Sequence, residues 1–289
     1  MLFHRIGRRK FNLYAMDVES HNDEESIAKR ETSIWLGCLI NDESKVENEE
    51  SYFYTIEEFI ERLEILSHKK RNKAKTRQCA NVCVYIYNLS FEWSFILPVI
   101  LANGWKWNEV INESEAKTYN TISTHSVSSV WEVNLSFGEG HGRVKLRDLA
   151  KIYGGGLSNV AKSFGLQTQK GSIDYRLNRL HGHIVTEEEK EYCFKDTRII
   201  IEILIEMLKR EDKDFFNAIS MASYSMKKLL SRGYPRKCKP YMAFREEYPE
   251  LSKEENAFLR MGVEGGITYA PERYQFRTIS DEIYHIDAH

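Results

Sequence analysis

The amino-acid sequence predicts a mixed α/β fold in which helices cover the faces of a sheet. Apolar, β-branched runs alternate with amphipathic stretches over residues 11–208, the order expected of strands and helices packed in layers. Residues 81–88 are almost continuously apolar and therefore favour a central strand that is buried on both faces. The chain has 289 residues, of which 42% are hydrophobic, so it can bury a sizeable core without a disulfide or a structural metal.

The predicted strands are short runs rich in Val, Ile and aromatic residues, bounded by turn-forming or charged residues. In chain order they are residues 11–19, 32–40, 51–55 and 81–88. Residues 130–149 add two further strands, because two apolar runs there flank the glycine-rich segment GEGHG. We therefore expect a hairpin over this range.

The predicted helices show apolar residues at helical spacing. In chain order they cover residues 55–66, 91–104, 157–166, 186–208 and 215–233. Pro98 is expected to kink or restart the second helix, and Gly104 to end it. Thr186 and Glu189 have the spacing of a capping box, so the longest helix is expected to begin at Thr186.

The pattern of strands and helices changes near residue 215. A helical stretch there leads into a segment that contains Tyr and Pro, and then into the glycine-containing run GGITYAPERYQF at 265–276. We therefore expect two domains, residues 1–215 and residues 216–289.

Composition narrows the classes of function. The net charge of −2 does not by itself indicate a polyanion partner, although basic residues gather at 4–10 and 68–77. The second cluster is either a solvated loop or a contact to phosphates. The five cysteines form neither a zinc motif nor a disulfide framework, and neither a signal peptide nor a membrane-length apolar run is present. We expect a cytoplasmic protein that has no membrane partner.

Two acids interrupt the first long apolar strand. Asp17 and Glu19 are two residues apart, so their side chains share one face of the strand, with Cα atoms about 7 Å apart. Two like charges on a half-buried face repel and lose hydration, and a divalent cation would remove both penalties. Oxygen ligands of this kind suit Mg²⁺ or Mn²⁺. The alternative is an exposed edge strand with two solvated acids.

The longest predicted helix carries an acid within its apolar stripe. Asp196 lies one turn after Tyr192, among the isoleucines that define the buried side. An acid that faces the core needs a partner, and a phenol beside it could orient a metal-bound water. The pair could equally be a Tyr–Asp contact at the border of the core.

A third acid follows the predicted central strand. Asn88 ends that strand, and Glu92 lies on the same helical face as Phe95. Ligand sites in open α/β sheets lie at such strand ends. Glu92 could instead be an acid that interacts favourably with the dipole at a helix N-terminus.

Together, four acids arise from an early strand, a strand-to-helix junction and a late helix, with a tyrosine four residues before the last acid. This arrangement resembles the DEDDy class of 3′–5′ exonucleases, which have an RNase H-like fold. The resemblance implies two divalent cations, Mg²⁺ or Mn²⁺, which clamp the scissile phosphate and activate water for in-line attack.

A closer resemblance is to the protein-primed family B DNA polymerases of bacteriophages and linear plasmids, and it spans essentially the whole chain. Six segments match motifs of that family in the expected order. They are DVES at 17–20, YNLSFEWSF at 87–95, KGSIDY at 170–175, YCFKD at 192–196, GGITYAPERYQF at 265–276 and YHIDAH at 284–289. The resemblance implies an exonuclease domain followed by the beginning of a polymerase palm, with the last segment similar to the start of polymerase motif A.

The resemblance also implies roles for matching side chains. Those that would hold the two metals are Asp17, Glu19, Glu92 and Asp196. Those that would contact a frayed, single-stranded 3′ end of DNA are Ser20, Asn88, Phe91, Phe95 and Tyr175. Tyr192 would orient the attacking water, and Lys170 would stabilise the phosphate. Asp287 would belong to an incomplete polymerase metal site.

The sequence departs from the family pattern at three places. The family usually has aspartate where Glu92 stands, and an aromatic residue where Val263 stands. The one extra methylene of Glu92 moves its carboxylate by about 1.5 Å, and a misplacement of about 1 Å can cost a hundredfold in rate. The sequence also stops at His289, before the rest of the polymerase motifs. We therefore expect either a fragment of a longer polymerase or a split gene, and no DNA synthesis by this chain alone.

The function expected from the sequence is that of the N-terminal part of a DNA-directed DNA polymerase with a two-metal proofreading exonuclease. A priming protein and a missing polymerase half are further expected partners, and the compartment would be a host cytoplasm if the source is viral. The alternative is a catalytically weak or inactive module of the same ancestry that binds single-stranded DNA or the priming protein. A stand-alone ribonuclease of the DEDD class is disfavoured, because it has no use for a palm-like segment at 260–289.

Overall fold

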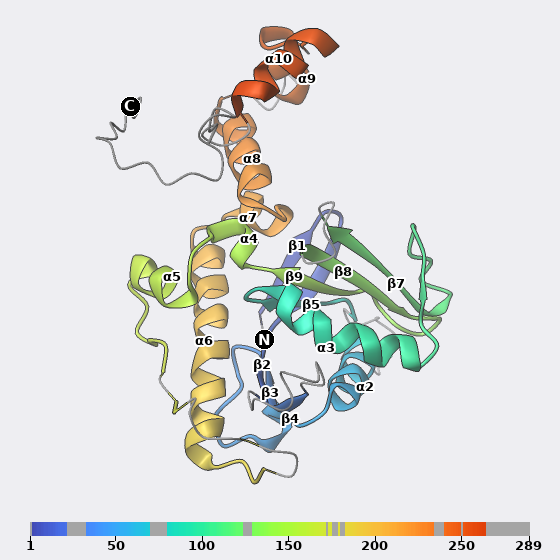
Figure 1. Ribbon diagram of the computed structural model, residues 1–289, viewed down its shortest axis with the longest axis vertical. Coiled ribbons are helices and arrows are strands. Elements are labelled where there is room, and N and C mark those ends of the chain that lie inside the picture. The colour runs from blue at the N-terminus through green and yellow to red at the C-terminus, as the bar shows by residue number, and fades with distance from the viewer. Residues whose placement is uncertain are drawn as a thin grey trace, which may run out of the picture. The chain divides into compact units, whose positions relative to one another are not determined.

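A computed structural model of the chain describes residues 2–21, 33–69, 80–123, 129–171, 173–174, 179, 183–233, 240–249 and 251–263. Within these ranges nine strands form one sheet, with the order β4-β3-β2-β5-β9-β8-β7-β6 and β1 paired to β2 (Figure 1). The strands are β1 Phe3–Ile6, β2 Arg9–Ser20, β3 Ile34–Ile40, β4 Tyr52–Phe53, β5 Val82–Ile86, β6 Lys106–Trp107, β7 Ala116–Ser123, β8 Val130–Phe137 and β9 Val144–Asp148. Strands β2, β5 and β9 are parallel neighbours, whereas β2–β3 and β8–β9 are antiparallel. The predicted α/β fold with a mixed sheet is confirmed.

The helices described are α2 Ile56–Ser67, α3 Leu89–Ala102, α4 Ala150–Tyr153, α5 Leu157–Phe164, α6 Glu187–Lys209, α7 Lys213–Asn217, α8 Met221–Gly233, α9 Pro240–Glu247 and α10 Lys253–Val263, with a 3₁₀ turn η1 at Glu49–Ser51. The chain divides into two compact units, Met1–Leu229 and Leu230–His289. The expected boundary between residues 215 and 216 stays a prediction. In the described part of the chain, no helix is both long and apolar enough to cross a membrane.

The sheet is covered on both faces, and β2 shows how. Leu13 and Ala15 belong to a core cluster that includes Ile200 of α6. Tyr14 and Met16 alternate with them and belong to the cluster formed with α2 and α3. Asp17 and Glu19 have the same parity as Leu13 and Ala15, so their side chains leave β2 on the face that α6 covers (Figure 1).

The central strand and the helix after it follow the sequence prediction, with one exception. All five residues of β5 are buried, and the strand lies between β2 and β9. α3 begins after Asn88 and ends before Gly104, whose φ of 80° places it in the left-handed region. The helix continues through Pro98, so of the two expected effects a restart there is wrong, and a kink stays a prediction.

The predicted capping box starts the longest helix. The Thr186 hydroxyl accepts a hydrogen bond from the Glu189 N–H at 3.3 Å, and the Thr186 N–H donates to the Glu189 carboxylate at 3.0 Å. Each bond satisfies an N–H that the first turn of a helix leaves unpaired. The helix then runs for 23 residues and buries its apolar stripe against β2 and β3.

Other boundaries differ from the sequence prediction. The strand expected at 51–55 is shortened to Tyr52–Phe53. The helix expected at 215–233 is two helices, α7 and α8, separated at residues 218–220, where the Ser223 hydroxyl accepts from the Ile219 and Ser220 N–H groups. The hairpin predicted at 130–149 is confirmed as β8 and β9. Strands β1, β6 and β7 were not predicted, because β1 lies in the basic cluster at 4–10, β6 has only two residues and β7 is largely polar.

A cluster of carboxylates from three elements

Asp17 and Glu19 lie near the end of β2, where burial and mutual repulsion oppose their ionisation. Burial, followed by the charge of Asp196, raises the pKa of Asp17 from 3.8 to about 7. Burial, followed by the charges of Asp17 and Asp196, raises the pKa of Glu19 from 4.5 to about 8. Asp196 and Lys170 act on both carboxyl groups, so the acid of α6 and the two acids of β2 share one electrostatic environment.

Asp196 is 1% exposed and lies on the face of α6 that packs on β2. Its Oδ2 atom is 3.1 Å from the Lys170 ammonium, and its buried Oδ1 atom has no hydrogen-bond partner within the part of the chain described. Lys170 also lowers the pKa values of Asp17 and Glu19. One lysine therefore compensates part of the charge of three acids.

Tyr192 lies one turn before Asp196 on α6 and is buried. Its ring packs against Gly171, where an added Cβ would come within 2.9 Å of the Tyr192 Cδ2 atom. The glycine therefore lets the segment that carries Lys170 pass close to the phenol. The predicted role of Tyr192 in orienting water stays a prediction.

Glu92, in the first turn of α3, belongs to the same group of acids. It is 2% exposed, and its buried Oε2 atom lacks a hydrogen-bond partner among the described residues. Burial, followed by the charge of Asp17, holds its pKa well above the usual value, and Asp148 and Glu19 act in the same direction. Asn88 precedes the helix in a left-handed conformation, with φ 73° and ψ 53°, and turns the chain from β5 into α3.

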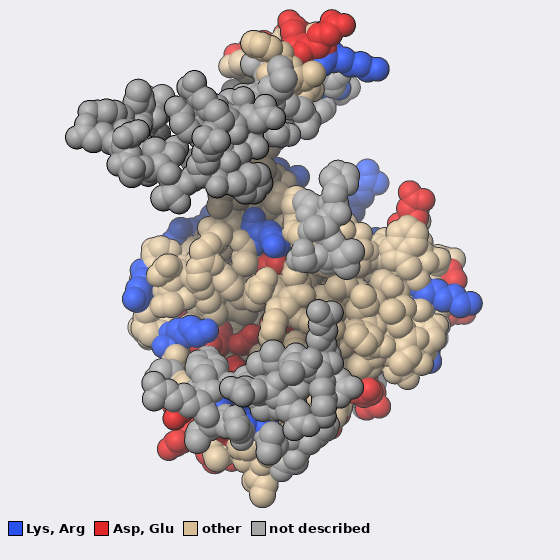
Figure 2. Space-filling model, in the orientation of Figure 1, with Lys and Arg blue, Asp and Glu red and all other residues tan. Residues whose placement is uncertain are grey.

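The structure therefore brings together all four acids that the sequence singled out. In Figure 2, acidic side chains gather over the region where α6 and β2 lie in Figure 1, with a basic side chain at the edge. Among the described residues, however, no three His, Cys, Asp or Glu side chains are placed so that they could hold a metal ion together. Binding a cation would require the carboxylates to move closer to one another.

The donor set nonetheless fits a hard divalent cation. All four groups are carboxylates, and two of them keep a buried oxygen without a hydrogen-bond partner in the described part of the chain. Their raised pKa values arise from burial and like charge, which a cation offsets directly. Mg²⁺ and Mn²⁺ prefer such oxygen ligands.

A pocket of about 250 Å³ opens beside the carboxylates. Its lining includes Glu19, Ser20 and Phe91, so two of the residues predicted to contact DNA share a wall with a predicted metal ligand. Phe91 is 42% exposed, and its ring meets that of Phe95 edge to face at 5.1 Å. Asn88 is exposed at the start of α3. Tyr175 and Asp287 lie outside the described residues.

Sequence reasoning missed two charged residues that border this site. Asp148 ends β9, and its Oδ1 atom accepts from the Asn88 N–H at 3.1 Å and the Ala150 N–H at 2.9 Å. Arg179 is buried, pairs with Glu189 at 2.6 Å and lowers the pKa of Glu19. The position of Asp148 at the end of a predicted strand could have identified it as a candidate site residue. Nothing in the sequence, in contrast, indicated that Arg179 lies beside β2.

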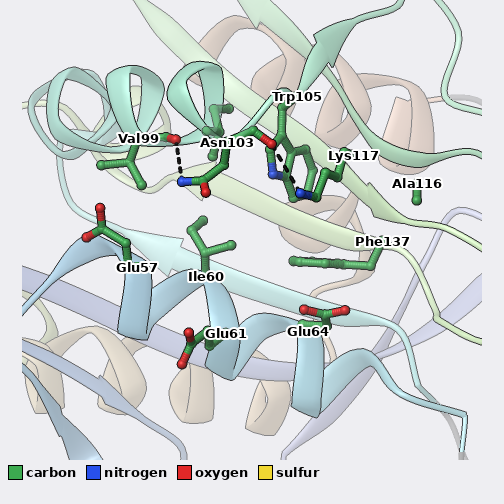
Figure 3. Close-up of a pocket in the computed structure, with 11 residues that line it drawn as sticks. Glu57, Ile60, Glu61, Glu64, Val99, Asn103, Trp105, Ala116, Lys117 and Phe137 are labelled. Atoms are coloured by element: carbon green, nitrogen blue, oxygen red, sulfur yellow. Dashed lines mark hydrogen bonds between the residues drawn. The ribbon is translucent and has the colours of Figure 1, made fainter.

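A second pocket, of about 320 Å³, lies between α2 and α3 (Figure 3). Glu57, Glu61 and Glu64 of α2 line one wall, and Trp105 and Phe137 face them. None of the residues predicted to act in metal or DNA binding lines this pocket. It therefore takes no part in the proposed site.

Comparisons with known proteins find similarity to phage DNA polymerases. No family model matches it. It is 30% identical to the DNA polymerase of Bacillus phage Nf over 202 residues, which make up 68% of this chain and 33% of the phage protein. It is 27% identical to the DNA polymerase of Bacillus phage phi29 over 202 residues, or 68% of this chain and 32% of that protein. This chain is a homologue of the phi29-type phage DNA polymerases.

The DNA polymerase of Streptococcus phage Cp-1 is similar over a longer range, with 23% identity over 280 residues, or 95% of this chain and 43% of that protein. The chain spans about a third of the length of the curated Bacillus phage relatives it matches.

Solved structures show the same fold. Phi29 DNA polymerase complexed with single-stranded DNA matches with a TM-score of 0.66 and 23% identity, covering 90% of this chain and 41% of that one. The ternary complex of phi29 DNA polymerase with primer-template DNA and incoming nucleotides matches with a TM-score of 0.63 and 23% identity. The match covers 91% of this chain and 40% of the phi29 chain. The mixed α/β fold of the chain is therefore similar to that of the matching part of phi29 DNA polymerase.

Proposed function

We propose that residues 1–215 form a metal-dependent 3′–5′ exonuclease domain with an RNase H-like fold, which belongs to a DNA-directed DNA polymerase of the protein-primed type. The observation that carries the proposal is the meeting of Asp17, Glu19, Glu92 and Asp196 from β2, α3 and α6, with raised pKa values at the first three. Strongly perturbed acids gathered beside a pocket are typical of catalytic sites.

Two divalent cations, Mg²⁺ or Mn²⁺, would be held by these four carboxylates. When bound, they would supply positive charge to the scissile phosphate and lower the pKa of the attacking water. Lys170 lies 3.1 Å from Asp196 and would add a further positive charge next to the phosphate. Tyr192, one turn before Asp196, would orient the water through its hydroxyl.

The substrate would be the frayed 3′ end of single-stranded DNA. Phe91 and Phe95 offer aromatic surface to unpaired bases, and Ser20 and Asn88 offer polar contacts near the pocket. Tyr175 would complete this set. The relative from phage phi29 has been solved in complex with single-stranded DNA, which supports the same class of partner here. A priming protein is a further proposed partner.

A second candidate function is a non-catalytic module that binds single-stranded DNA or the priming protein. It is favoured by glutamate at position 92, where the family usually has aspartate. The four carboxylates also lie too far apart, as the structure stands, for any three to hold a metal together.

A nuclease assay separates the two candidates. The chain is incubated with 5′-labelled DNA that has a 3′ overhang, in Mg²⁺, in Mn²⁺ and in chelator. We expect stepwise shortening from the 3′ end in either metal, none in chelator, and none by the Asp17→Ala variant. Binding of DNA without shortening in either metal would favour the non-catalytic module.

A further inference from the structure

The pocket between α2 and α3 has no role in the proposed exonuclease, yet its two sides are chemically complementary to a ligand (Figure 3). Its volume of about 320 Å³ lies at the lower end of the range for ligand pockets. Glutamates of α2 form one wall, and residues of α3, β7 and β8, together with Trp105, form the rest. A pocket of this size suits a few side chains or a short peptide segment.

The wall formed by α2 is negatively charged. Glu57, Glu61 and Glu64 lie at positions i, i+4 and i+7 of the helix, so they follow one another along one face. All three are exposed, and Glu57 and Glu61 form no ion pair with any residue that the structure describes. The Oε1 atom of Glu64 lies 4.0 Å from the Nε2 atom of His141. Two negative charges in the described part of this wall therefore have no counter-charge.

The opposite side of the pocket holds a hydrogen-bond donor that is not used. Trp105 is 5% exposed, and its ring meets that of Phe137 edge to face at 5.1 Å. The only polar group of an indole is its Nε1–H, which can donate but not accept, and which is usually paired when it is buried. The Nε1–H of Trp105 bonds to none of the described residues, although the side chain lines the pocket (Figure 3). It would be satisfied by an acceptor oxygen of a ligand.

The space between the two sides is apolar. Ile60 extends into it from α2 and Val99 from α3, and Phe137 lies across from them (Figure 3). The aliphatic stems of Lys and Arg pack on such surfaces while their charged ends stay at the rim. The pocket therefore calls for a ligand that combines positive charge, an aliphatic stem and an acceptor oxygen.

An extended peptide segment with basic side chains has all three features. Its backbone carbonyls are free to accept, whereas the carbonyls within a helix are already bonded to that helix. Alternate side chains of an extended segment share one face, about 7 Å apart. Glu57 and Glu61 are about 6 Å apart along the axis of α2, because they are separated by four residues. Basic residues at alternate positions therefore match the spacing of these two acids.

We propose that the pocket between α2 and α3 binds an extended segment of a partner protein that carries Lys or Arg at alternate positions. Two basic side chains pair with Glu57 and Glu61, and their stems pack on Ile60 and Val99. A backbone carbonyl of the segment accepts a hydrogen bond from the Trp105 Nε1–H. The pocket shares no lining residue with the one beside the carboxylates, so this interaction does not depend on nuclease activity.

The test is a titration of the full chain, in chelator, with the synthetic peptide Arg-Thr-Arg-Thr-Arg, blocked at both ends. The readout is the set of indole N–H signals in a proton–nitrogen correlation NMR spectrum of the chain, which has five tryptophans. The Trp105 signal, assigned by its loss in the Trp105→Phe variant, should shift as peptide is added. The Trp35 signal should stay in place, because its Nε1–H already donates to the Ser20 carbonyl at 3.2 Å.

Binding of the same peptide, with a fluorescent label, separates the roles of charge and hydrogen bond. Glu57→Gln with Glu61→Gln should weaken binding by about tenfold at low salt and reduce its dependence on salt. Trp105→Phe keeps an aromatic ring but loses the donor, so it should weaken binding by about threefold or more with the salt dependence unchanged. The matched control, Glu188→Gln with Glu254→Gln, removes two exposed carboxylates elsewhere and should bind as the parent does.

Three results overturn the proposal. They are an unshifted Trp105 signal at saturating peptide, a loss of binding in the matched control as large as that in the Glu57 and Glu61 variant, and a shift of the Trp35 signal in place of the Trp105 signal. The last would place the peptide beside the carboxylates, because Trp35 lines the pocket there.

Spermine tests the choice of a peptide over a simple polycation. It carries positive charge on an aliphatic chain but has no carbonyl, so it should shift the Trp105 signal far less than the peptide does. An equal shift with spermine overturns the choice of ligand. Melting temperatures within a few degrees of the parent confirm that the variants compared are folded.

Discussion

The ammonium of Lys170 lies 3.1 Å from the Oδ2 atom of Asp196, so this lysine pairs directly with one member of the group of acids. The same ammonium lowers the pKa values of Asp17 and Glu19. Lys170 thus links the segment before α6 to the acids of β2. Its substitution should change both the chemistry of the site and its dependence on pH.

Lys170→Met should slow shortening of DNA by about a hundredfold, the cost typical of losing one charge-stabilising donor in a catalytic site. It should also move the rising limb of the pH–rate profile to higher pH, because Asp17 and Glu19 would lose the charge that lowers their pKa values. Lys170→Arg keeps the charge and should leave the limb near its parent position. An unshifted profile for Lys170→Met would show that the lysine does not act on the carboxylates.

The stability that Asp17 and Glu19 contribute to the metal-free chain should fall as pH rises from about 4 to about 8. Asp17 and Glu19 have folded-state pKa values of about 7 and about 8, above their ordinary values. Between those limits the folded chain keeps protons that the unfolded chain has released, so raising the pH favours unfolding. Urea midpoints measured in chelator across this range test the prediction.

The control for this dependence is the Asp17→Asn, Glu19→Gln variant. It removes both titrating groups and should flatten the loss of stability toward alkaline pH. At pH ~8, added Mn²⁺ should restore the stability of the parent chain and have little effect on the stability of the variant. A parent chain whose urea midpoint depends on pH in the same way as that of the variant would contradict the raised pKa values.

Glu92→Asp should raise the rate of shortening, by about tenfold or more. The change withdraws the carboxylate by about 1.5 Å, to the reach that the family's usual aspartate has, and catalysis is sensitive to displacements of about 1 Å. Glu92→Gln is the matched control, since it keeps the length but removes the charge and should abolish shortening. Single-turnover rates measure both, and a slower Glu92→Asp variant would show that glutamate is adapted to this site.

Asp148→Ala should destabilise the chain by about 1–3 kcal/mol, because it leaves the N–H groups of Asn88 and Ala150 without their acceptor. Shortening should slow as well, since Asn88 turns the chain into the helix that carries Glu92. Asp148→Asn retains an acceptor oxygen and should preserve most of both properties. If Asp148→Asn and Asp148→Ala lose equal amounts of stability and activity, the charge of Asp148 matters rather than its hydrogen bonds.

The sequence predicted those parts of the structure that depend on local pattern. The spacing of Asp17 and Glu19 was enough to place both on one face of β2, and Thr186 with Glu189 was enough to start α6. The acids Glu92 and Asp196 were ambiguous individually, because an acid in an apolar stripe can lie at the border of a core. Their meeting with β2 depends on how α3 and α6 pack on the sheet.

Other features depended on contacts that no local pattern reveals. Asp148 reaches Asn88 because β9 becomes the neighbour of β5, and Arg179 is held beside the site by contacts that include its pairing with Glu189. Strand β7 escaped prediction because its sequence, AKTYNTIS, has a polar, partly exposed pattern. The motifs at 265–276 and 284–289, and the side chain of Val263, lie outside the described residues, so their roles stay predictions.

The most direct test of the central claim is a Mn²⁺ titration of the metal-free chain, with free Mn²⁺ followed by electron paramagnetic resonance. The parent chain is predicted to bind two Mn²⁺ ions, more tightly near pH ~8 than near pH ~6, because the carboxyl groups must lose their protons. The Asp17→Asn, Asp196→Asn variant should lose this binding, whereas Glu57→Gln with Glu61→Gln, on α2, should retain it. Equal binding by the parent chain and by the Asp17→Asn, Asp196→Asn variant would contradict the account.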